Sequence, residues 1–363
     1  MNSLVSESRI EHDIRELASA PRNSRENPAG HAEAAEWIAA EFKRIGLVAS
    51  RQSFEIPGQT PPRQGINVIG TLNGRTGNSP VPRSMLIGAH YDTVPGSPGA
   101  DDNASGVVAL LECARTLASE KSDRAIAFVA FDAEEMQTPV EGLHGSTAYV
   151  ARLTPYDTPG GAIIFESVGF TSTSKKQRLP GSFRFLFRRT YKALVRQNFS
   201  AESLLILSRG PGRAISRELE KSAATPAIQL PILPLEVPRW MPMFRNLRRS
   251  DHAPFWDKGL AALMVTDTAY FRNTNYHGPG DKPETLDYAF MARLIESLEL
   301  ALADLAGGGG MKGRVKIKYR RYRGPPPYLQ LISRFLHALR QDLFLAQAPR
   351  QSLYRAMQSG GPP

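Results

Sequence analysis

Histidine and carboxylate residues gather where apolar runs of this sequence end, and residues 84–111 show the pattern first. This stretch reads SMLIGAHYDTVPGSPGADDNASGVVALL. An apolar run stops at His90, Asp92 lies two residues later, and a loop of Pro, Gly and Ser leads to Asp101 and Asp102. The pattern predicts a buried strand, a loop and a helix, with a His and two or three carboxylates at the turn. Imidazole and carboxylate together suit zinc and related divalent metals.

The same arrangement recurs at three later points. Glu134 and Glu135 follow a second apolar run, Glu166 follows a third, and His277 follows a fourth after a loop. These runs span residues 125–131, 161–165 and 260–265. A single His or Glu after a strand would mean little, so the recurrence is what indicates a site.

The elements that must position these side chains are apolar strands alternating with helices. Such alternation predicts an α/β fold with a largely parallel sheet covered on both faces. Ligands of such sheets bind beyond the carboxyl ends of the strands, which is where the candidate residues fall.

Flanking segments complete the predicted fold. Residues 1–50 are expected to be helical, residues 51–56 and 66–72 to be strands, and residues 287–306 to form a final amphipathic helix. Residues 168–250 are expected to form a helix and a long loop beside the site, because the sequence PAIQLPILPLEVPRWMP is too rich in Pro for an interior strand or helix.

Charge divides the chain into a body and a tail. The 363 residues carry a net charge of +10, but eleven of the 45 Lys and Arg and only one of the 35 acidic residues lie from Lys312 onward. Residues 1–311 therefore hold 34 of each sign. We expect one domain at 1–306, a Gly linker at 307–311 and a basic tail at 312–363, amphipathic or disordered.

Composition narrows the class of protein. A hydrophobic content of 41% with 22% charged residues is that of a globular protein, and no apolar run approaches the roughly 20 residues of a membrane span. No signal peptide is visible at the N-terminus, so a cytoplasmic location is expected. The neutral body predicts no nucleic-acid partner for the main domain, whereas the tail is a candidate for contact with an anionic surface or a protein.

The candidate residues suffice for a centre of two metal ions. Such a centre, with ions about 3.5–4 Å apart, needs a bridging carboxylate and further ligands on each ion. The chain offers five for this purpose: His90, Asp102, Glu135, Glu166 and His277. Glu134 is placed to act as a general base, and Asp92 can accept the second ring N–H of His90.

Five motifs in this order resemble the co-catalytic di-zinc exopeptidases, metallopeptidase family twenty-eight, which includes bacterial leucyl aminopeptidases and glutamate carboxypeptidases. They are GAHYD, GADDNASG, FDAEE with a following G-L-x-G-S, SDHxPFW and YHGPGDKPETLDY. The match covers roughly residues 30–305. It implies one α/β domain with a central mixed sheet flanked by helices.

The resemblance also implies a role for each motif residue. His90 and Glu166 are ligands of one zinc ion, Glu135 and His277 are ligands of the other, and Asp102 bridges them. Glu134 is the general base that activates water for attack on a peptide carbonyl, and Asp92 orients His90. Substrate contacts are expected, on weaker grounds, from Arg272, Tyr276 and Asp251.

Several functions remain open on the sequence alone. The first is an aminopeptidase that releases N-terminal residues from peptides. A dipeptidase like glutamate carboxypeptidase and an enzyme like glutaminyl cyclase use a similar scaffold, although the cyclases use one zinc ion. A binding module without catalysis is the alternative from another class.

Overall fold

The computed structural model describes residues 5–58, 63–74, 84–119, 125–135, 142–179, 182–238 and 245–306. The prediction of a linker and basic tail at 307–363 lies outside these residues. A second unit, which includes residues 178–199, separates from the main unit by its contacts and is described by itself.

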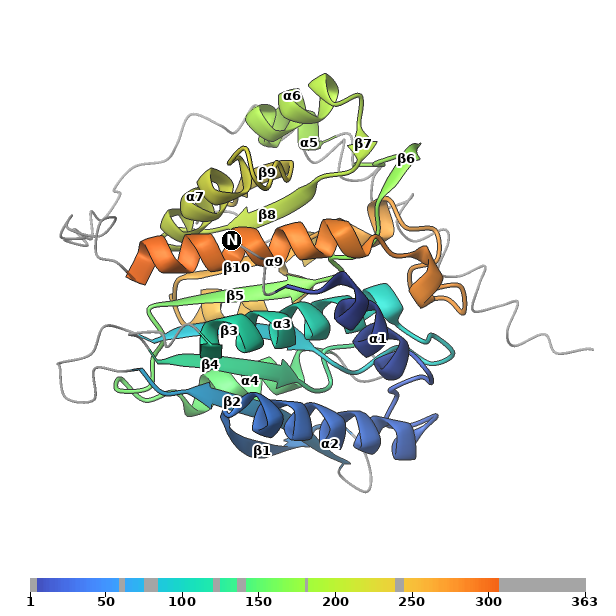
Figure 1. Cartoon of the computed structure of the whole chain (residues 1–363), viewed down its shortest axis with the longest axis vertical. Helices are drawn as coiled ribbons and strands as arrows, with labels where there is room; N and C mark the ends of the chain where they lie inside the picture. Colours follow the sequence, from blue (N-terminus) through green and yellow to red (C-terminus); the bar gives the residue numbers. More distant parts are fainter. Residues whose placement is uncertain are drawn as a thin grey trace, which may run out of the picture. The chain divides into compact units, whose positions relative to one another are not determined.

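The main unit is built on an eight-stranded mixed sheet (Figure 1). The strands lie in the order β1-β2-β4-β3-β5-β10-β8-β9. Their bounds are β1 Val48–Ile56, β2 Arg63–Leu72, β3 Met85–His90, β4 Ile126–Phe131, β5 Gly161–Glu166, β8 Leu204–Ser208, β9 Ile232–Glu236 and β10 Ala262–Thr266. The four central strands β4, β3, β5 and β10 are parallel, and β2 and β8 join them antiparallel. The predicted mixed, mostly parallel sheet is confirmed.

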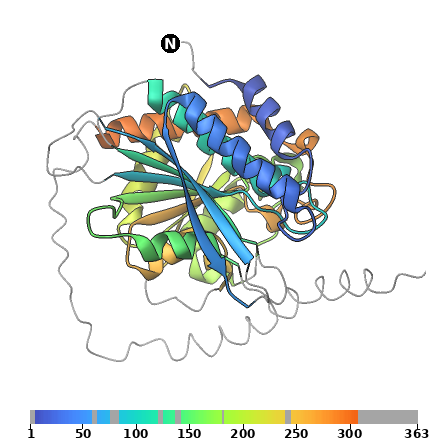
Figure 2. The same ribbon diagram turned by 90° about the horizontal axis from the view of Figure 1, so that it is seen from below.

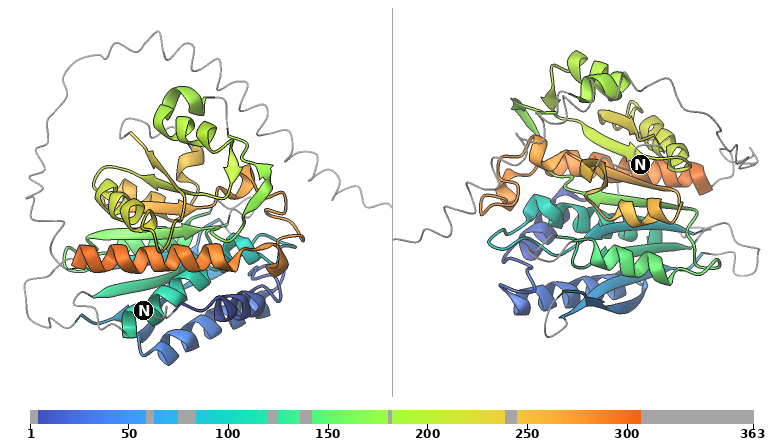
Figure 3. Two further views of the ribbon diagram at one scale, coloured as in Figure 1. Left: turned by 45° about the horizontal axis from the view of Figure 1, so that its top comes forward. Right: turned by 180° about the vertical axis from the view of Figure 1, so that it is seen from behind.

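Helices cover both faces of this sheet. Figures 2 and 3 show α2, α3 and α9 along one face and α4 and α8 on the other. The helices of the main unit are α1 Glu7–Leu17, α2 Pro28–Ile45, α3 Gly106–Ser119, α4 His144–Arg152, α7 Gly212–Ala223, α8 His252–Asp257 and α9 Tyr288–Ala306. Most side chains of β3, β5 and β10 are buried from solvent, so their apolar runs form the centre of the core.

Local sequence explains where the helices begin and end. The Asn27 side chain accepts the Gly30 N–H at the start of α2, with Pro28 in the first turn. Gly46 ends this helix at φ +92°, a left-handed conformation that glycine adopts without steric cost. The predicted strands and helices of residues 1–166 are all found to within a few residues.

Residues 168–250 hold more regular structure than the sequence prediction of a helix and a long loop. They contain the short strands β6 (Ser172–Lys176) and β7 (Ser200–Ala201), the sheet strands β8 and β9, and helix α7. Part of the Pro-rich segment forms a strand, β9, which lies at the edge of the sheet beside β8. An edge strand tolerates Pro234, whose missing N–H costs no ladder hydrogen bond on the open side.

Truncation of a central core side chain tests this packing. Phe128 lies in β4 and is fully buried, whereas Tyr156 is 88% exposed. We expect Phe128→Ala to lower the free energy of unfolding by about 3–5 kcal/mol through lost burial and a cavity. Tyr156→Ala should change it by less than about 0.5 kcal/mol. Equal effects of both variants in urea unfolding would contradict the core placement of β4.

Candidate metal centre

The ends of the central parallel strands bring five candidate metal ligands together. His90 is the last residue of β3 and Glu166 is the last residue of β5, while Glu135 follows β4. Asp102 lies in the irregular turn before α3, and His277 lies in the loop after β10. Neighbouring parallel strands end at one edge of the sheet, which is why residues far apart in sequence converge there.

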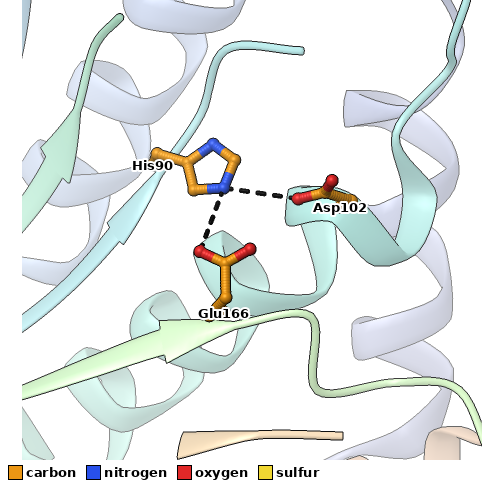
Figure 4. A group of neighbouring side chains, drawn as sticks. All are labelled: His90, Asp102 and Glu166. Carbon is orange, nitrogen blue, oxygen red and sulfur yellow. Dashed lines mark ion pairs between the residues drawn. The ribbon is translucent and has the colours of Figure 1, made fainter. Parts of the chain in front are cut away.

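Three overlapping groups of ligand atoms result: His90, Glu134 and Glu135 form one of them, and the other two both contain Asp102. His90, Asp102 and Glu166 form one group (Figure 4), and Asp102, Glu135 and His277 form the other. Within each group the candidate atoms lie within 4.8 Å of one another. His90 Nε2 is 3.3 Å from Asp102 Oδ1 and 3.4 Å from Glu166 Oε2. His277 Nε2 is 3.0 Å from Asp102 Oδ2 and 3.1 Å from Glu135 Oε1.

Orphaned polar atoms show that these groups fit a metal. His90 Nε2, His277 Nε2 and both carboxylate oxygens of Asp102 are buried and make no hydrogen bond with the described residues. Leaving such atoms unpaired costs free energy unless a ligand satisfies them. Two imidazole nitrogens and several carboxylate oxygens aimed at shared points are a donor set for zinc or a similar ion.

The charges in the site also favour a bound cation. Burial lowers the pKa of His277, but the carboxylates of Glu135 and Asp102 outweigh it and raise the pKa to about 10. The pKa of His90 is likewise raised, against the effect of burial, by Glu166 and Glu134. Burial alone would raise the pKa of Asp102, yet the two histidines hold it below its usual range. The site therefore attracts positive charge strongly.

Glu134 lies beside the ligands and belongs to neither of the two groups that share Asp102. Its Oε2 is 4.0 Å from His90 Nε2, and its side chain is largely buried. Burial raises the pKa of this carboxyl well above its usual value, His90 opposes the rise, and Glu166 and Glu135 add to it. A carboxylate with such proton affinity, next to a metal centre, has the properties of a general base.

Asp92 acts differently from the sequence prediction. Its carboxylate lies 3.6 Å from His90 Nδ1, beyond hydrogen-bond range, and the nearer acceptor is the main-chain oxygen of Asp92 at 3.2 Å. The carboxylate instead accepts the N–H groups of Glu134 and Glu135 at 3.0 and 3.1 Å. Asp92 thus positions the base and a ligand at once.

Two further residues, which the sequence analysis did not single out, hold the Asp102 loop. The carboxylate of Asp281 accepts the N–H groups of Asp101 and Asp102 at 2.8 and 3.0 Å. The buried guanidinium of Arg22 donates to four main-chain oxygens, three of them in the loop between His90 and Asp102. Asp281 lies within the motif YHGPGDKPETLDY, but both residues make these contacts with the backbone, so their partners cannot be named from side-chain spacing.

Backbone strain accompanies the ligands. Ala133 just before Glu134, Ser167 just after Glu166, and His277 itself have φ values of +54°, +50° and +59°. Such left-handed conformations are unfavourable for residues other than glycine and are concentrated at functional sites.

Ser250 also reaches the candidate ligands, a contact that the sequence analysis does not predict. Its hydroxyl donates to Glu166 Oε2 at 2.7 Å. Arg249, the preceding residue, is exposed and makes no hydrogen bond or ion pair with the described residues. Desolvation lowers the pKa of Arg249, but Tyr276, Glu134, Glu135 and Glu166 outweigh it and raise the pKa.

Of the three expected substrate contacts, those of Tyr276 and Asp251 stay predictions. The Tyr276 ring stacks on that of His277 at 3.9 Å between centroids, and Tyr276 is partly exposed. Asp251 is completely buried, burial raises its pKa to about 7, and its two carboxylate oxygens make no hydrogen bond with the described residues.

The prediction that the Arg272 side chain contacts substrate directly is wrong. Its guanidinium is buried and donates to Thr268 Oγ1 at 3.1 Å and to the main-chain oxygens of Phe170, Ala201 and Ser203. These bonds tie neighbouring loops together, so the side chain is structural.

Comparison with known proteins supports the geometry. Residues 67–213 match the model of peptidase family M28. The protein YfbL of Escherichia coli is 28% identical over 73% of this chain and 77% of its own length. Aminopeptidase YwaD of Bacillus subtilis is 42% identical over 31% of this chain and 24% of its own.

A solved structure has the same fold. The zinc aminopeptidase BSAP from Bacillus subtilis is 18% identical and superposes with a TM-score of 0.62 over 83% of this chain and 95% of its own. The predicted α/β fold with a central mixed sheet is therefore confirmed.

Arginine substitutions test the two assignments above. Arg272→Lys keeps the charge but loses the fork of donors, so we expect the free energy of unfolding to fall by about 3 kcal/mol. Arg249→Lys, at an exposed position, should change it by less than about 0.5 kcal/mol. If Arg272→Lys left the free energy of unfolding unchanged and raised KM for peptides, the result would support a substrate contact of Arg272 after all.

A pair formed by His31 and Asp132 near the site gives a prediction about how stability depends on pH. His31 Nε2 lies 2.8 Å from Asp132 Oδ1, and Asp132 stands at the start of the turn that carries Glu134. Burial lowers the pKa of His31, but the hydrogen bond and charge of Asp132 outweigh it and raise the pKa. A raised folded-state pKa adds stability below the unfolded pKa of about 6.5, and this stability is lost as pH rises through the folded value.

We therefore expect His31→Gln to destabilise the protein more at pH 6 than at pH 9, measured by urea unfolding at both pH values. The exposed His12→Gln serves as the matched control. A His31→Gln effect that is equal at both pH values would show that the pair is not charged.

The matched motifs, the convergence of five candidate ligands at one sheet edge, and the shared fold agree with the match of residues 67–213 to peptidase family M28, which confirms the predicted resemblance to that family.

Proposed function

We propose that the protein is a zinc-dependent aminopeptidase with two zinc ions. The observation that carries the proposal is the placement of Asp102, whose two oxygens face different histidines, His90 and His277. His90, Asp102 and Glu166 would hold one ion, and Asp102, Glu135 and His277 would hold the other. A carboxylate that serves both groups is what a pair of neighbouring ions requires.

Zinc in such a site polarises the scissile carbonyl and makes water acidic enough to give up a proton near neutral pH. Residues of the chain carry out the remaining steps. Glu134 accepts the proton of the attacking water at its carboxylate and returns it to the nitrogen of the leaving amine. Asp92 fixes Glu134 through the main chain, so the base keeps its place during both transfers. Tyr276, beside His277, can donate a hydrogen bond because burial and nearby carboxylates keep its hydroxyl protonated.

Charge favours recognition of a substrate amine. Asp92, Asp102, Glu134, Glu135 and Glu166 are all largely buried in one place. Two divalent ions neutralise four of these five negative charges, so the loaded site keeps a net negative charge. A protonated N-terminal amine is attracted to such a site.

Arg249 supports a second candidate, a dipeptidase. This exposed cation precedes Ser250, whose hydroxyl contacts the ligand Glu166. A guanidinium there could pair with the free carboxylate of a short peptide. The cyclase alternative is less well supported, because one zinc ion would leave part of the ligand set unused. Glu134 and the full ligand set also count against a module without catalysis.

Metal titration combined with a change of the base tests the proposal. We expect hydrolysis of aminoacyl 4-nitroanilides to saturate near two zinc ions per chain, with zinc measured by mass spectrometry. Glu134→Gln should lower kcat by about 10²–10⁴-fold while zinc content stays the same, because Glu134 is the base and not a ligand.

The matched control is Glu36→Gln, an exposed position on α2. Substrates with a blocked N-terminus should not be cleaved by an aminopeptidase, and a strong preference for free dipeptides that is lost in Arg249→Gln would favour the dipeptidase. Full activity of Glu134→Gln, or no bound zinc, would overturn the proposal.

A further inference from the structure

Residues 178–199 carry an unusual concentration of positive charge. They contain six Lys or Arg and no acidic residue. When these six are removed from the 34 basic residues of positions 1–311, 28 remain against 34 acidic residues. The rest of the body is therefore acidic, and its apparent neutrality depends on this one segment.

The segment is a short helical pair with two distinct faces. Helix α5 (Phe183–Leu186) and helix α6 (Arg188–Arg196) are separated by Phe187 (Figure 1). Phe183 and Phe187 are buried with ring centroids 4.8 Å apart, and Leu194 is fully buried. The exposed face holds five cations: Arg184, Arg188, Arg189, Lys192 and Arg196.

Apolar side chains interrupt the basic face. Phe185 is 60% exposed and Val195 is 51% exposed, although large apolar side chains are usually covered. The guanidinium of Arg184 lies 4.5 Å from the centroid of the Phe185 ring. In the part of the chain that the structure describes, no carboxylate pairs with any of the five cations.

Charge limits what can cover this face. The tail from Lys312 onward has eleven basic residues and one acidic residue, so it is repelled by the helical pair. A second copy related by two-fold symmetry would present the same basic face. An anionic partner fits, and exposed Phe and Val beside the cations match a lipid bilayer, where basic side chains meet phosphate and apolar ones enter the boundary with the acyl chains.

We propose that residues 178–199 form a docking surface for a membrane of anionic phospholipid. Clusters of four to eight Lys and Arg on an amphipathic helix are the pattern that binds acidic lipid headgroups. Each basic residue near such a surface strengthens partitioning about fivefold. Phe185 and Val195 add an apolar contact that does not depend on salt.

Vesicle binding of the full chain tests the proposal. Sedimentation with vesicles would compare phosphatidylcholine alone with phosphatidylcholine containing about one third phosphatidylglycerol. We expect binding only to the anionic vesicles, weakening as salt is added. Arg188→Gln/Lys192→Gln/Arg196→Gln should weaken it about a hundredfold, since three contributions of about fivefold are lost. Phe185→Ser should weaken it at high salt as well.

The matched control removes three exposed cations elsewhere, Lys43→Gln/Arg51→Gln/Arg217→Gln, and should bind as the unaltered chain does. Circular dichroism of each variant establishes that it is folded, without reference to peptidase activity. Equal binding of the two triple variants would overturn the proposal and assign vesicle binding to the tail. Tighter binding to single-stranded RNA than to anionic vesicles, lost in the same variant, would overturn the choice of partner.

Discussion

The main physical constraint on this structure is the free-energy cost of burying several carboxylates next to two histidines at one edge of a sheet. Asp102, Glu135 and Glu166 lie largely out of water, and the orphaned nitrogens of His90 and His277 point at them. Burial of unpaired charge is strongly unfavourable, so this arrangement is stable only with cations in it. Metal binding would thus stabilise this edge of the fold and also supply its chemistry.

Around that centre the protein uses main-chain contacts to fix side chains that must not move. Asp92 accepts two amides of the turn after β4, and Asp281 accepts two amides of the turn before α3. Arg22 reaches from the N-terminal segment to hold the loop between His90 and Asp102. Each contact joins segments that are distant in sequence, so the helices and loops outside the sheet contribute directly to the geometry of the ligands.

Negative and positive charge are concentrated in different parts of the chain. The main unit concentrates negative charge at the sheet edge, where metal ions and a substrate amine are attracted. Residues 178–199 concentrate positive charge on an exposed helical pair that takes no part in holding the metals. No helix in the described part of the chain is both long and apolar enough to cross a membrane.

Much of this architecture follows from the sequence alone. Apolar runs of five to seven residues fixed the central strands, because parallel strands buried on both faces leave no room for polar side chains. The candidate ligands His90, Glu135, Glu166 and His277 could be proposed in advance, since each follows such a strand or belongs to one of the five motifs. Strands β8 and β9 could not, because Pro at a sheet edge is tolerated only once the neighbouring strand is in place.

Tertiary structure alone decided which polar residues face the site. Arg272 and Arg249 are the same residue type, yet their environments differ. The Arg272 guanidinium is buried and donates to main-chain oxygens, whereas Arg249 is exposed. Asp92 likewise binds amides of a turn 42 and 43 residues away instead of the nearby imidazole ring. Side-chain type and spacing specify what a residue can bind, but its actual partners depend on long-range packing, which brings distant backbone within hydrogen-bond reach.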